Sequence, residues 1–334
     1  MSDSAPTLED VARVAGVSRA TVSRVINGIR NVDTEIQKVV RRAIEETGYA
    51  PNRAARSLVT RRTGAVALVV SGAGEPAEHV FGDPFFGRVV AGVVDVLRRH
   101  GSHPLLMLAD TPDARTDVIA HLRQGGADGA LLVSTLAEDP LPAMCVRAGI
   151  PAVLFARPTP PVAISYVDLA HRAGAALAAR HLLARGCTRL ATISGPLDVP
   201  ASRDRLDGFR DELARPAPNE PGNFTHESGE AAMSRLLAAH PDLDGVFVAN
   251  DLMAQGALGV LHREGRRVPD DVALVGFDDS SPARSCRPAL TTVRQPVEDM
   301  GAELARLLLA HIEEPARPTI SMIFDPTLVV REST

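Results

Sequence analysis

The stretch Thr7-Leu-Glu-Asp-Val-Ala-Arg-Val-Ala-Gly-Val-Ser-Arg-Ala-Thr-Val-Ser-Arg-Val-Ile-Asn-Gly28 decides the fold of the amino-terminal part of the chain. Its apolar residues recur at helical spacing in two short runs, and Gly16 separates the runs because glycine turns the chain at little steric cost. Thr7 and Asp10 have the spacing of a capping box, and Ser18 has the side chain and the position of a second cap. The stretch therefore predicts two short helices joined by a tight turn.

A third helix is predicted after these two. It begins at Asp33 or Thr34, carries apolar residues at helical spacing and ends at Gly48. A helix, a short turn that contains glycine and a second short helix make the helix-turn-helix pattern. Residues 1–50 are therefore expected to form an all-α domain of the helix-turn-helix type.

The polar side of the second helix has the chemistry that reads duplex DNA. In the major groove, arginine binds guanine bidentately, asparagine binds adenine, and alanine contacts the methyl group of thymine. The residues that project on this side are Arg19, Ala20, Ser23, Arg24 and Asn27. The spacing alone also fits a small helical bundle with a solvated polar face, and both interpretations stay open at this point.

The same stretch resembles, without gaps, the DNA-binding signature of the lactose-repressor (LacI/GalR) family of bacterial transcription regulators. The resemblance implies that Thr7, Ser18 and Thr21 join the DNA contacts, and it favours the DNA-reading interpretation. Double-stranded operator DNA is the partner that it implies.

A hinge is expected over residues 51–62, because Tyr49-Ala-Pro-Asn-Arg-Ala-Ala-Arg-Ser-Leu58 also resembles the family pattern. A helix of about seven residues does not hold alone in water, so the segment is expected to be a linker away from DNA. In the family, the hinge helices of two subunits order on the operator and enter its minor groove. The residues that the resemblance assigns to this contact, with leucine as the wedge, are Asn52, Arg53, Ala55 and Leu58.

Charge is distributed unevenly along the 334 residues. The net charge is −5, yet residues 1–62 hold 11 Lys or Arg against 7 Asp or Glu. A basic head on an acidic remainder indicates that only the head meets a polyanion. The absence of Trp and the presence of only 2 Tyr argue against stacking on single-stranded nucleic acid.

Composition also excludes several classes of protein. No apolar run approaches the ~20 residues of a membrane helix, and the amino terminus has no signal-peptide pattern. The 3 cysteines have no C-x-x-C spacing, which indicates reduced thiols rather than disulfides or structural zinc. We therefore expect a cytoplasmic protein without a metal or a cofactor.

Residues 63–334 follow a different pattern. Continuous apolar runs such as Ala65–Val70 and Ala130–Val133 alternate with helical stretches, which is typical of a parallel sheet covered on both faces. The alternation occurs twice, so the expected fold class is α/β with two doubly wound parallel-sheet lobes. Lobe one is expected over about residues 63–165 plus 294–317, and lobe two over about 166–293 plus 318–334.

This body resembles the effector domain of the same repressor family, which shares its build with periplasmic sugar-binding proteins. The landmarks include Gly195-Pro196, Ala249-Asn-Asp251 and Val275-Gly-Phe-Asp-Asp279. The resemblance implies a sugar or sugar-like effector, bound between the lobes, that controls operator affinity. The effector contacts carried over by position are Phe85, Phe86, Arg205, Phe224, Asn250 and Asp278.

Each of these contacts has a structural alternative. The arginine has the neighbours for a surface ion pair with Asp204 or Asp207, and the asparagine has the position of a helix cap. The last aspartate is suited to a turn, and the phenylalanines are suited to a hydrophobic core. The sequence leaves these alternatives open.

Two departures from the family pattern concern the effector. Ala156 stands before Arg157 where many members have an acid, and the usual Asp-Asn pair is not clearly reproduced around Asp168–His171. A pocket with one carboxylate fewer has lost an acceptor for ligand hydroxyls. The departures therefore favour a less hydroxylated or differently charged effector over a common hexose.

The sequence lacks the motifs that an enzyme or a transport protein on this fold would need. Gly72-Ala-Gly74-Glu-Pro-Ala77 fits the dinucleotide fingerprint, but Pro76 intervenes before the next helical pattern. An enzyme on this fold would need a cofactor or a base beside a nucleophile, and a transport protein would need an export signal in place of the DNA-binding head. We therefore expect a non-enzymatic regulator, a repressor, whose effector either releases or promotes operator binding. Since no heptad tail follows the last expected strand, we expect a homodimer.

Overall fold

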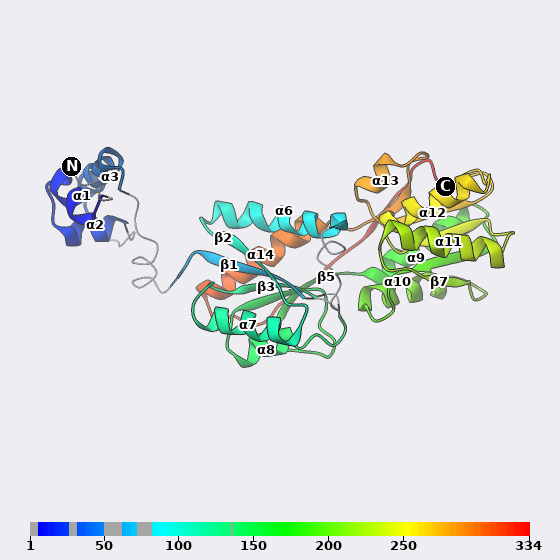
Figure 1. Cartoon of the computed structure of the whole chain (residues 1–334), viewed down its shortest axis with the longest axis horizontal. Coiled ribbons are helices and arrows are strands. Elements are labelled where there is room, and N and C mark those ends of the chain that lie inside the picture. Colours follow the sequence, from blue (N-terminus) through cyan, green and yellow to red (C-terminus); the bar gives the residue numbers. More distant parts are fainter. Residues whose placement is uncertain (1–5, 27–31, 50–61, 72–81, 135) are drawn as a thin grey trace. The chain divides into compact units, whose positions relative to one another are not determined.

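The computed structural model describes residues 6–26, 32–49, 62–71, 82–134 and 136–334. Along the chain, three helices come first, and strands then alternate with helices to the carboxyl end (Figure 1). None of the helices in these ranges is long and apolar enough to span a membrane.

The head contains the three predicted helices. Thr7 caps the first of them, because its hydroxyl accepts the N–H of Asp10 while the Asp10 carboxylate accepts the N–H of Thr7. Gly16 ends this helix in the left-handed region with φ 64°, where a side chain would be strained. The helices are α1 (Leu8–Ala15), α2 (Arg19–Ile26) and α3 (Thr34–Thr47).

The core of the head is small. The apolar faces of the three helices meet in one cluster of buried residues, which is Val11, Ala15, Val22, Val40 and Ala43. The predicted cap of α3 is also present, since the Asp33 carboxylate accepts the N–H groups of Glu35 and Ile36. The predicted helix-turn-helix organisation is thus confirmed.

The first sheet has six strands in the order β11-β5-β4-β3-β1-β2. The pairs β1–β3, β3–β4, β4–β5 and β5–β11 are all parallel. The strands are β1 (Ala65–Ser71), β2 (His103–Leu108), β3 (Ala130–Ser134), β4 (Ala152–Phe155), β5 (Ser165–Leu169) and β11 (Ser321–Phe324).

Helices cover both faces of this sheet (Figure 1). On one face α6 (Pro84–Arg99) packs along α14 (Val297–Glu313), and on the other face lie α7 (Pro112–Arg123) and α8 (Leu141–Arg147). The contact between α6 and α14 depends on glycine, because a Cβ at Gly92 would lie 2.0 Å from the backbone oxygen of Glu298.

The second sheet has the order β12-β10-β9-β8-β6-β7. Its pairs are parallel between β7, β6, β8, β9 and β10, and β12 runs antiparallel to β10. The strands are β6 (Leu190–Ser194), β7 (Asn219–Pro221), β8 (Gly245–Val248), β9 (Ala273–Asp278), β10 (Thr291–Arg294) and β12 (Thr327–Val329).

This sheet is also covered on both faces (Figure 1). The paired helices α9 (His171–Ala184) and α10 (Pro200–Asp211) lie on one face, and α11 (His226–Ala239) and α12 (Asp251–Arg263) on the other. The short helix α13 (Ser281–Ser285) packs against α12. Two doubly wound α/β lobes are therefore present, as the sequence predicted.

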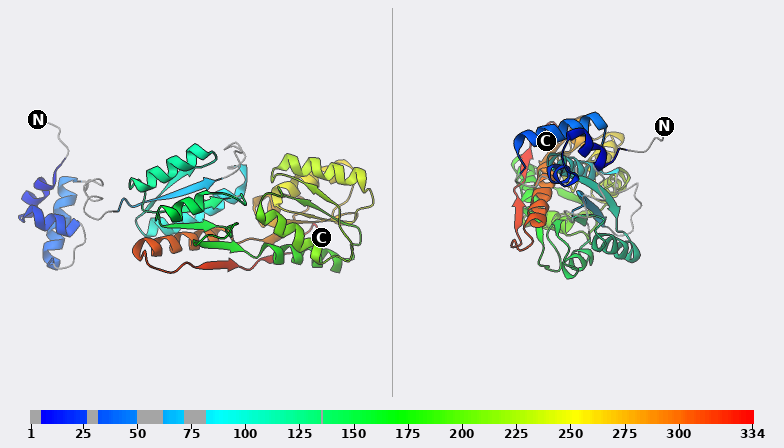
Figure 2. Two further views of the ribbon diagram at one scale, coloured as in Figure 1. Left: turned by 90° about the horizontal axis from the view of Figure 1, so that it is seen from below. Right: turned by 90° about the vertical axis from the view of Figure 1, so that its left-hand side faces the viewer.

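The chain crosses between the two sheets three times: after β5, between β10 and α14, and between β11 and β12 (Figure 2). This differs from the expected boundaries, which placed residues 166–169 and 321–324 in lobe two. Both segments pair in the first sheet, where β5 lies between β4 and β11. The difference arises because Ser165-Tyr-Val-Asp-Leu169 alternates polar and apolar residues and so lacks the continuous apolar run of a central strand.

Candidate functional sites

A cavity of about 830 Å³ lies between the two sheets, at the carboxyl ends of their parallel strands. Open α/β sheets bind ligands at these strand ends, and ligand pockets reach about 1,000 Å³. All six residues expected to contact an effector line this one cavity: Phe85, Phe86, Arg205, Phe224, Asn250 and Asp278. Their proximity agrees with the expectation, while their role in binding stays a prediction.

Arg205 is the cation at the centre of this cavity. Its side chain is buried, and the guanidinium donates to His171 Nδ1 at 3.2 Å, to the Ala249 carbonyl at 2.5 Å and to Gln295 Oε1 at 3.2 Å. It also lies over the Phe277 ring, 3.8 Å from the centroid, where a cation is attracted to the π face. Since a guanidinium has five N–H donors, these three bonds leave donors for a ligand.

The surface alternative for Arg205 does not hold. Its carboxylate neighbour is Asp278, whose Oδ1 lies 3.7 Å from Nη1 of Arg205. Asp207, one of the partners considered from the sequence, instead pairs with Arg172 at 3.5 Å on the exposed side of the helix.

Asp278 ends β9 inside the cavity. Burial raises the pKa of its carboxyl well above the usual range, although Arg205 beside it acts in the opposite direction. Burial likewise raises the pKa of the Asp83 carboxyl, which lies at the amino end of α6 and accepts the N–H of Phe85 at 2.9 Å. The pair of acids and one arginine makes this end of the cavity a set of donors and acceptors suited to hydroxyl groups.

Asn250 is both a helix cap and a lining residue. Its Oδ1 accepts the N–H of Met253 at 2.9 Å and its Nδ2 donates to the Phe224 carbonyl at 3.0 Å. The cap predicted as an alternative is therefore confirmed, and the same amide anchors the loop that carries Phe224. Gly195 makes room for that loop, because a Cβ there would lie 2.4 Å from the Phe224 ring.

Phenylalanines form an apolar wall of the cavity. The Phe85 ring meets the Phe86 ring edge to face at 5.2 Å between centroids and the Phe155 ring at 5.3 Å. Phe86 is also buried in the main hydrophobic core, so the core role considered from the sequence is real for this residue. A lining of aromatic side chains with a few placed polar groups is typical of small-molecule sites.

Backbone strain is concentrated around the cavity. Among the described residues other than glycine, four have positive φ: Ala156 (98°), Phe224 (68°), Asp278 (107°) and Asp279 (52°). The first three line the cavity. Positive φ in residues with a side chain costs free energy and is found mainly at functional sites.

On the head, α2 presents a polar side to solvent. Arg19, Ala20 and Arg24 are exposed, while Val22 on the opposite side is fully buried. Ser18 caps the helix by accepting the N–H of Thr21 at 3.1 Å. This is the arrangement predicted for a recognition helix.

Asn27 and the hinge residues Asn52, Arg53, Ala55 and Leu58 lie outside the described residues, as does the glycine-rich segment after β1. Within the described ranges, no group of three or more His, Cys, Asp or Glu side chains is arranged to hold a metal ion.

Comparison with known proteins matches both parts of the chain. The family of bacterial regulatory proteins named lacI matches residues 7–52, and a periplasmic binding protein-like domain matches residues 179–334. The HTH-type transcriptional regulator CelR of Thermobifida fusca is 45% identical, covering 98% of this chain and 98% of its own. The chain belongs to the lacI family.

Solved structures of lacI-family proteins share the fold. A CelR–cellobiose complex has a TM-score of 0.76 at 42% identity, covering 98% of this chain and 100% of that one. A lac repressor dimer bound to operator and the anti-inducer ONPF has a TM-score of 0.85 at 26% identity, covering 99% of both chains. This lacI-family chain is therefore a DNA-binding transcription regulator and not an enzyme, with an effector domain of the periplasmic binding protein type.

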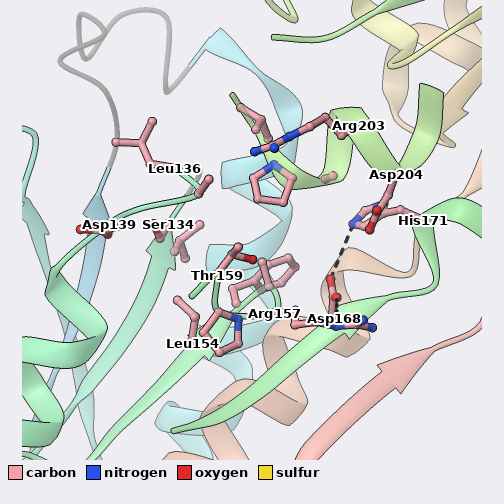
Figure 3. A pocket seen from close by; sticks show the side chains of 18 of the residues that line it. Ser134, Leu136, Asp139, Leu154, Arg157, Thr159, Asp168, His171, Arg203 and Asp204 are labelled. Atoms are coloured by element: carbon pink, nitrogen blue, oxygen red, sulfur yellow. Dashed lines mark ion pairs between the residues drawn. The ribbon is translucent and has the colours of Figure 1, made fainter. Parts of the chain in front are cut away.

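The lacI-family pocket also contains polar residues that the sequence did not assign to it. His171, Asp168, Arg157 and Asp204 line the cavity together on the side opposite Ser134 and Leu136 (Figure 3). The signal was partly present, because Arg157 and Asp168–His171 mark the two departures from the family pattern. No periodicity brings these positions together, since the loop after β4, strand β5 and helices α9 and α10 supply them separately.

Proposed function

We propose that this protein is a dimeric repressor whose operator binding is controlled by an uncharged sugar, with cellobiose as the first candidate. The observation that carries the proposal is the buried set of Arg205, Asn250 and Asp278 in a cavity of about 830 Å³ between two sheets. CelR, described as a cellobiose complex, supports the choice of sugar through its 42% identity and nearly complete coverage.

Charge argues for an uncharged ligand. The cavity is lined by the carboxyl groups of Asp83, Asp168, Asp204, Asp278 and Glu138 against three arginines, while Asp139 in the lining pairs with Arg115 at 3.2 Å. A phosphate or uronate group would add like charge to the ionised acids of this lining and would keep the others protonated, whereas hydroxyls both donate to carboxyl oxygens and accept from guanidinium groups. Sugar phosphates should therefore bind poorly.

The test uses the full-length protein and duplex DNA. An operator is first selected from randomised double-stranded oligonucleotides at low ionic strength, and its affinity is then measured by fluorescence anisotropy while cellobiose, galactose, ribose or glucose 6-phosphate is added. We expect a selected site and a change in operator affinity with cellobiose alone, and the sign of the change distinguishes release from promotion. Failure to select any site, or a response to the phosphate ester only, would refute the proposal.

The DNA contacts are proposed in two sets. The polar side of α2, with Arg19, Ala20, Ser23 and Arg24 and with its cap Ser18, reads base edges together with Asn27, and Thr7 and Thr21 hold the phosphate backbone. The hinge residues Asn52, Arg53 and Ala55 approach the minor groove, where Leu58 acts as the wedge. Leu58→Ala should weaken operator binding and leave sugar binding intact, and equal operator affinity in both proteins would contradict the wedge.

A second copy of the chain is the proposed partner at β2. This strand is at the edge of the first sheet, and its leucines Leu105, Leu106 and Leu108 are 38%, 50% and 40% exposed. An edge strand with exposed apolar side chains is a site for association. Sedimentation should give a dimer for the natural protein and a shift toward monomer for Leu106→Lys, and an unchanged dimer would place the interface elsewhere.

Because its proposed partner is operator DNA, we assign the protein to the cytoplasm.

A further inference from the structure

The cavity contains a continuous row of polar side chains that is longer than the set expected from the family. Asp278 Oδ1 lies 3.7 Å from Arg205 Nη1, and Arg205 Nε lies 3.2 Å from His171 Nδ1. The row continues from His171 Nε2 to Asp168 Oδ1 at 3.7 Å and from Asp168 Oδ2 to Arg157 Nε at 3.6 Å. We call these five residues the polar row; Figure 3 shows its second half.

The polar row extends over both lobes. Asp278 ends β9 of the second sheet and Arg205 lies on α10, which packs on that sheet, whereas Asp168 lies on β5 of the first sheet and Arg157 follows β4. A single sugar ring is already provided for by Arg205, Asn250 and Asp278 at one end. The groups at the other end, which we call the distal cluster, are Arg157, Asp168, His171 and Asp204.

The distal cluster has unused hydrogen-bonding capacity. Asp168 is 6% exposed, and its contacts with Arg157 and His171 at 3.6 and 3.7 Å are longer than hydrogen bonds. Burial raises the pKa of this carboxyl, while the nearby backbone N–H groups of Leu169 and Arg157 act in the opposite direction, and acceptor positions remain on a group with about four. Asp204 makes no hydrogen bond with any residue that the structure describes.

Asp168 also replaces the acid that is missing at Ala156. Phe155 on β4 pairs with Val167 on β5, and the N–H of Ala156 bonds to the carbonyl of Val167 at 2.8 Å. Ala156, the first residue after β4, therefore lies beside Asp168 of β5, so Asp168 stands next to the position where an acid was expected. This removes the sequence-based argument against a richly hydroxylated effector.

We propose that the distal cluster binds the hydroxyls of a second sugar ring, so that the protein distinguishes a disaccharide from a monosaccharide. This inference rests on the proposed function and adds the residues that select ligand length. In it, Asp168 and Asp204 accept from hydroxyls and Arg157 donates to them, while His171 accepts from Arg205 and joins the two ends. The cavity volume of about 830 Å³, near the upper end for ligand pockets, agrees with a ligand of more than one ring.

The test is calorimetric titration of full-length protein with cellobiose and with glucose. Asp168→Asn and Asp204→Asn keep the size of the side chain and remove its charge, and Asp207→Asn, on the exposed side of α10, is the matched control. We expect each of the first two variants to weaken cellobiose about tenfold or more, because a charged hydrogen bond is lost. Glucose affinity should change by less than about twofold, and the control should leave both sugars unaffected.

The outcomes separate this inference from the proposed function. Equal losses for the two sugars, or no loss for either, would overturn the distal cluster while the function stands. Absence of sugar binding by the natural protein would overturn the function and this inference with it. Asp204 is on the surface of its helix, so its variant keeps the test valid if the buried Asp168→Asn fails to fold.

Discussion

The head and the effector domain place their functional side chains in opposite environments. On α2 of the head, the arginines proposed to meet DNA are exposed to solvent, and the cluster of fully buried residues among the described part of the head has five members. In the effector domain, Arg205, Asn250 and Asp278 are 6%, 2% and 7% exposed and lie among two extensive hydrophobic cores.

The two parts differ in the free energy that it costs them to hold their charged functional side chains. Exposed arginines remain hydrated, so the head carries them at little cost even though its core is small. Buried charges must be paired and hydrogen-bonded, and only a large domain offsets their desolvation. A small core should therefore be the weak point of the head, and buried polar groups with strained backbone should be the weak points of the effector domain.

The largest effect is expected in the head. Val22→Ala removes two methyl groups from a fully buried position and should lower the head's free energy of unfolding by about 2 kcal/mol. Since a domain of this size has only a few kcal/mol of stability, operator affinity should fall while sugar affinity is unchanged. Anisotropy with operator and calorimetry with sugar measure the two properties.

Val14→Ala is the control, because Val14 on the neighbouring helix α1 is 48% exposed. It should leave operator binding within about twofold, as surface substitutions usually do. Loss of sugar binding in Val22→Ala would show that the head and the effector domain do not unfold independently.

A smaller effect is expected from the buried histidine. Burial, with Arg205 and Arg157 nearby, lowers the pKa of His171 well below 6.5. Below pH 6.5 the unfolded chain then binds a proton that the folded chain does not, so the free energy of unfolding decreases as pH falls. The loss is at most about 1.4 kcal/mol per pH unit. His171→Gln, which keeps an acceptor for Arg205, should abolish this part of the decrease.

The facing acids act in the opposite sense. Burial raises the pKa of Asp168 and Asp278, so the folded chain holds their protons more tightly and gains stability as pH falls. The natural protein and His171→Gln share these acids. The difference between their free energies of unfolding as pH falls therefore reports His171 alone. Denaturant unfolding at pH 7.0, 6.0 and 5.0 measures it, with the exposed His262→Gln as control. If the free energy of unfolding has the same pH slope in the natural protein and in His171→Gln, burial of His171 does not lower the stability of the effector domain at low pH.

The smallest effect concerns backbone strain. Ala156→Gly should raise the free energy of unfolding by about 0.5 kcal/mol, because relief of φ 98° outweighs the entropy that glycine loses on folding. The same substitution at Ala231, exposed in the middle of α11, should lower it by about 1 kcal/mol. A decrease of similar size at both positions, seen in thermal unfolding, would mean that the pocket stores no strain at Ala156.

Features of the fold that depend on interactions between neighbours in the sequence were predictable, and features that depend on contacts between distant segments were not. The capping box of Thr7 and the stop at Gly16 were predictable because both depend on neighbours within one turn of helix. The continuous apolar strands β1, β3, β4, β6, β8 and β9 were predictable because burial on both faces leaves an uninterrupted pattern. Strand β5 was not, since Tyr166 and Asp168 interrupt its apolar residues.

The pocket was predictable only where a motif exists. Arg205, Asn250 and Asp278 were found through family landmarks, and their convergence on one cavity follows from strand order. The contact of Arg205 with His171 and the level of Asp168 beside Ala156 depend on side-chain packing and on strand register between segments far apart in sequence. Neither leaves a local signal.

The last two strands, β11 and β12, belong to different sheets, and this has a practical consequence for fragments of the protein. Strand β11 completes the edge of the first sheet and β12, three residues later, completes the edge of the second. Ser333 then bonds to the carbonyl of Leu274 at the far end of the second lobe's sheet. A truncation after Glu313 thus removes an edge strand from both lobes. No continuous segment of the chain contains one whole lobe without part of the other. An isolated lobe therefore requires a circularly permuted gene or two co-expressed segments.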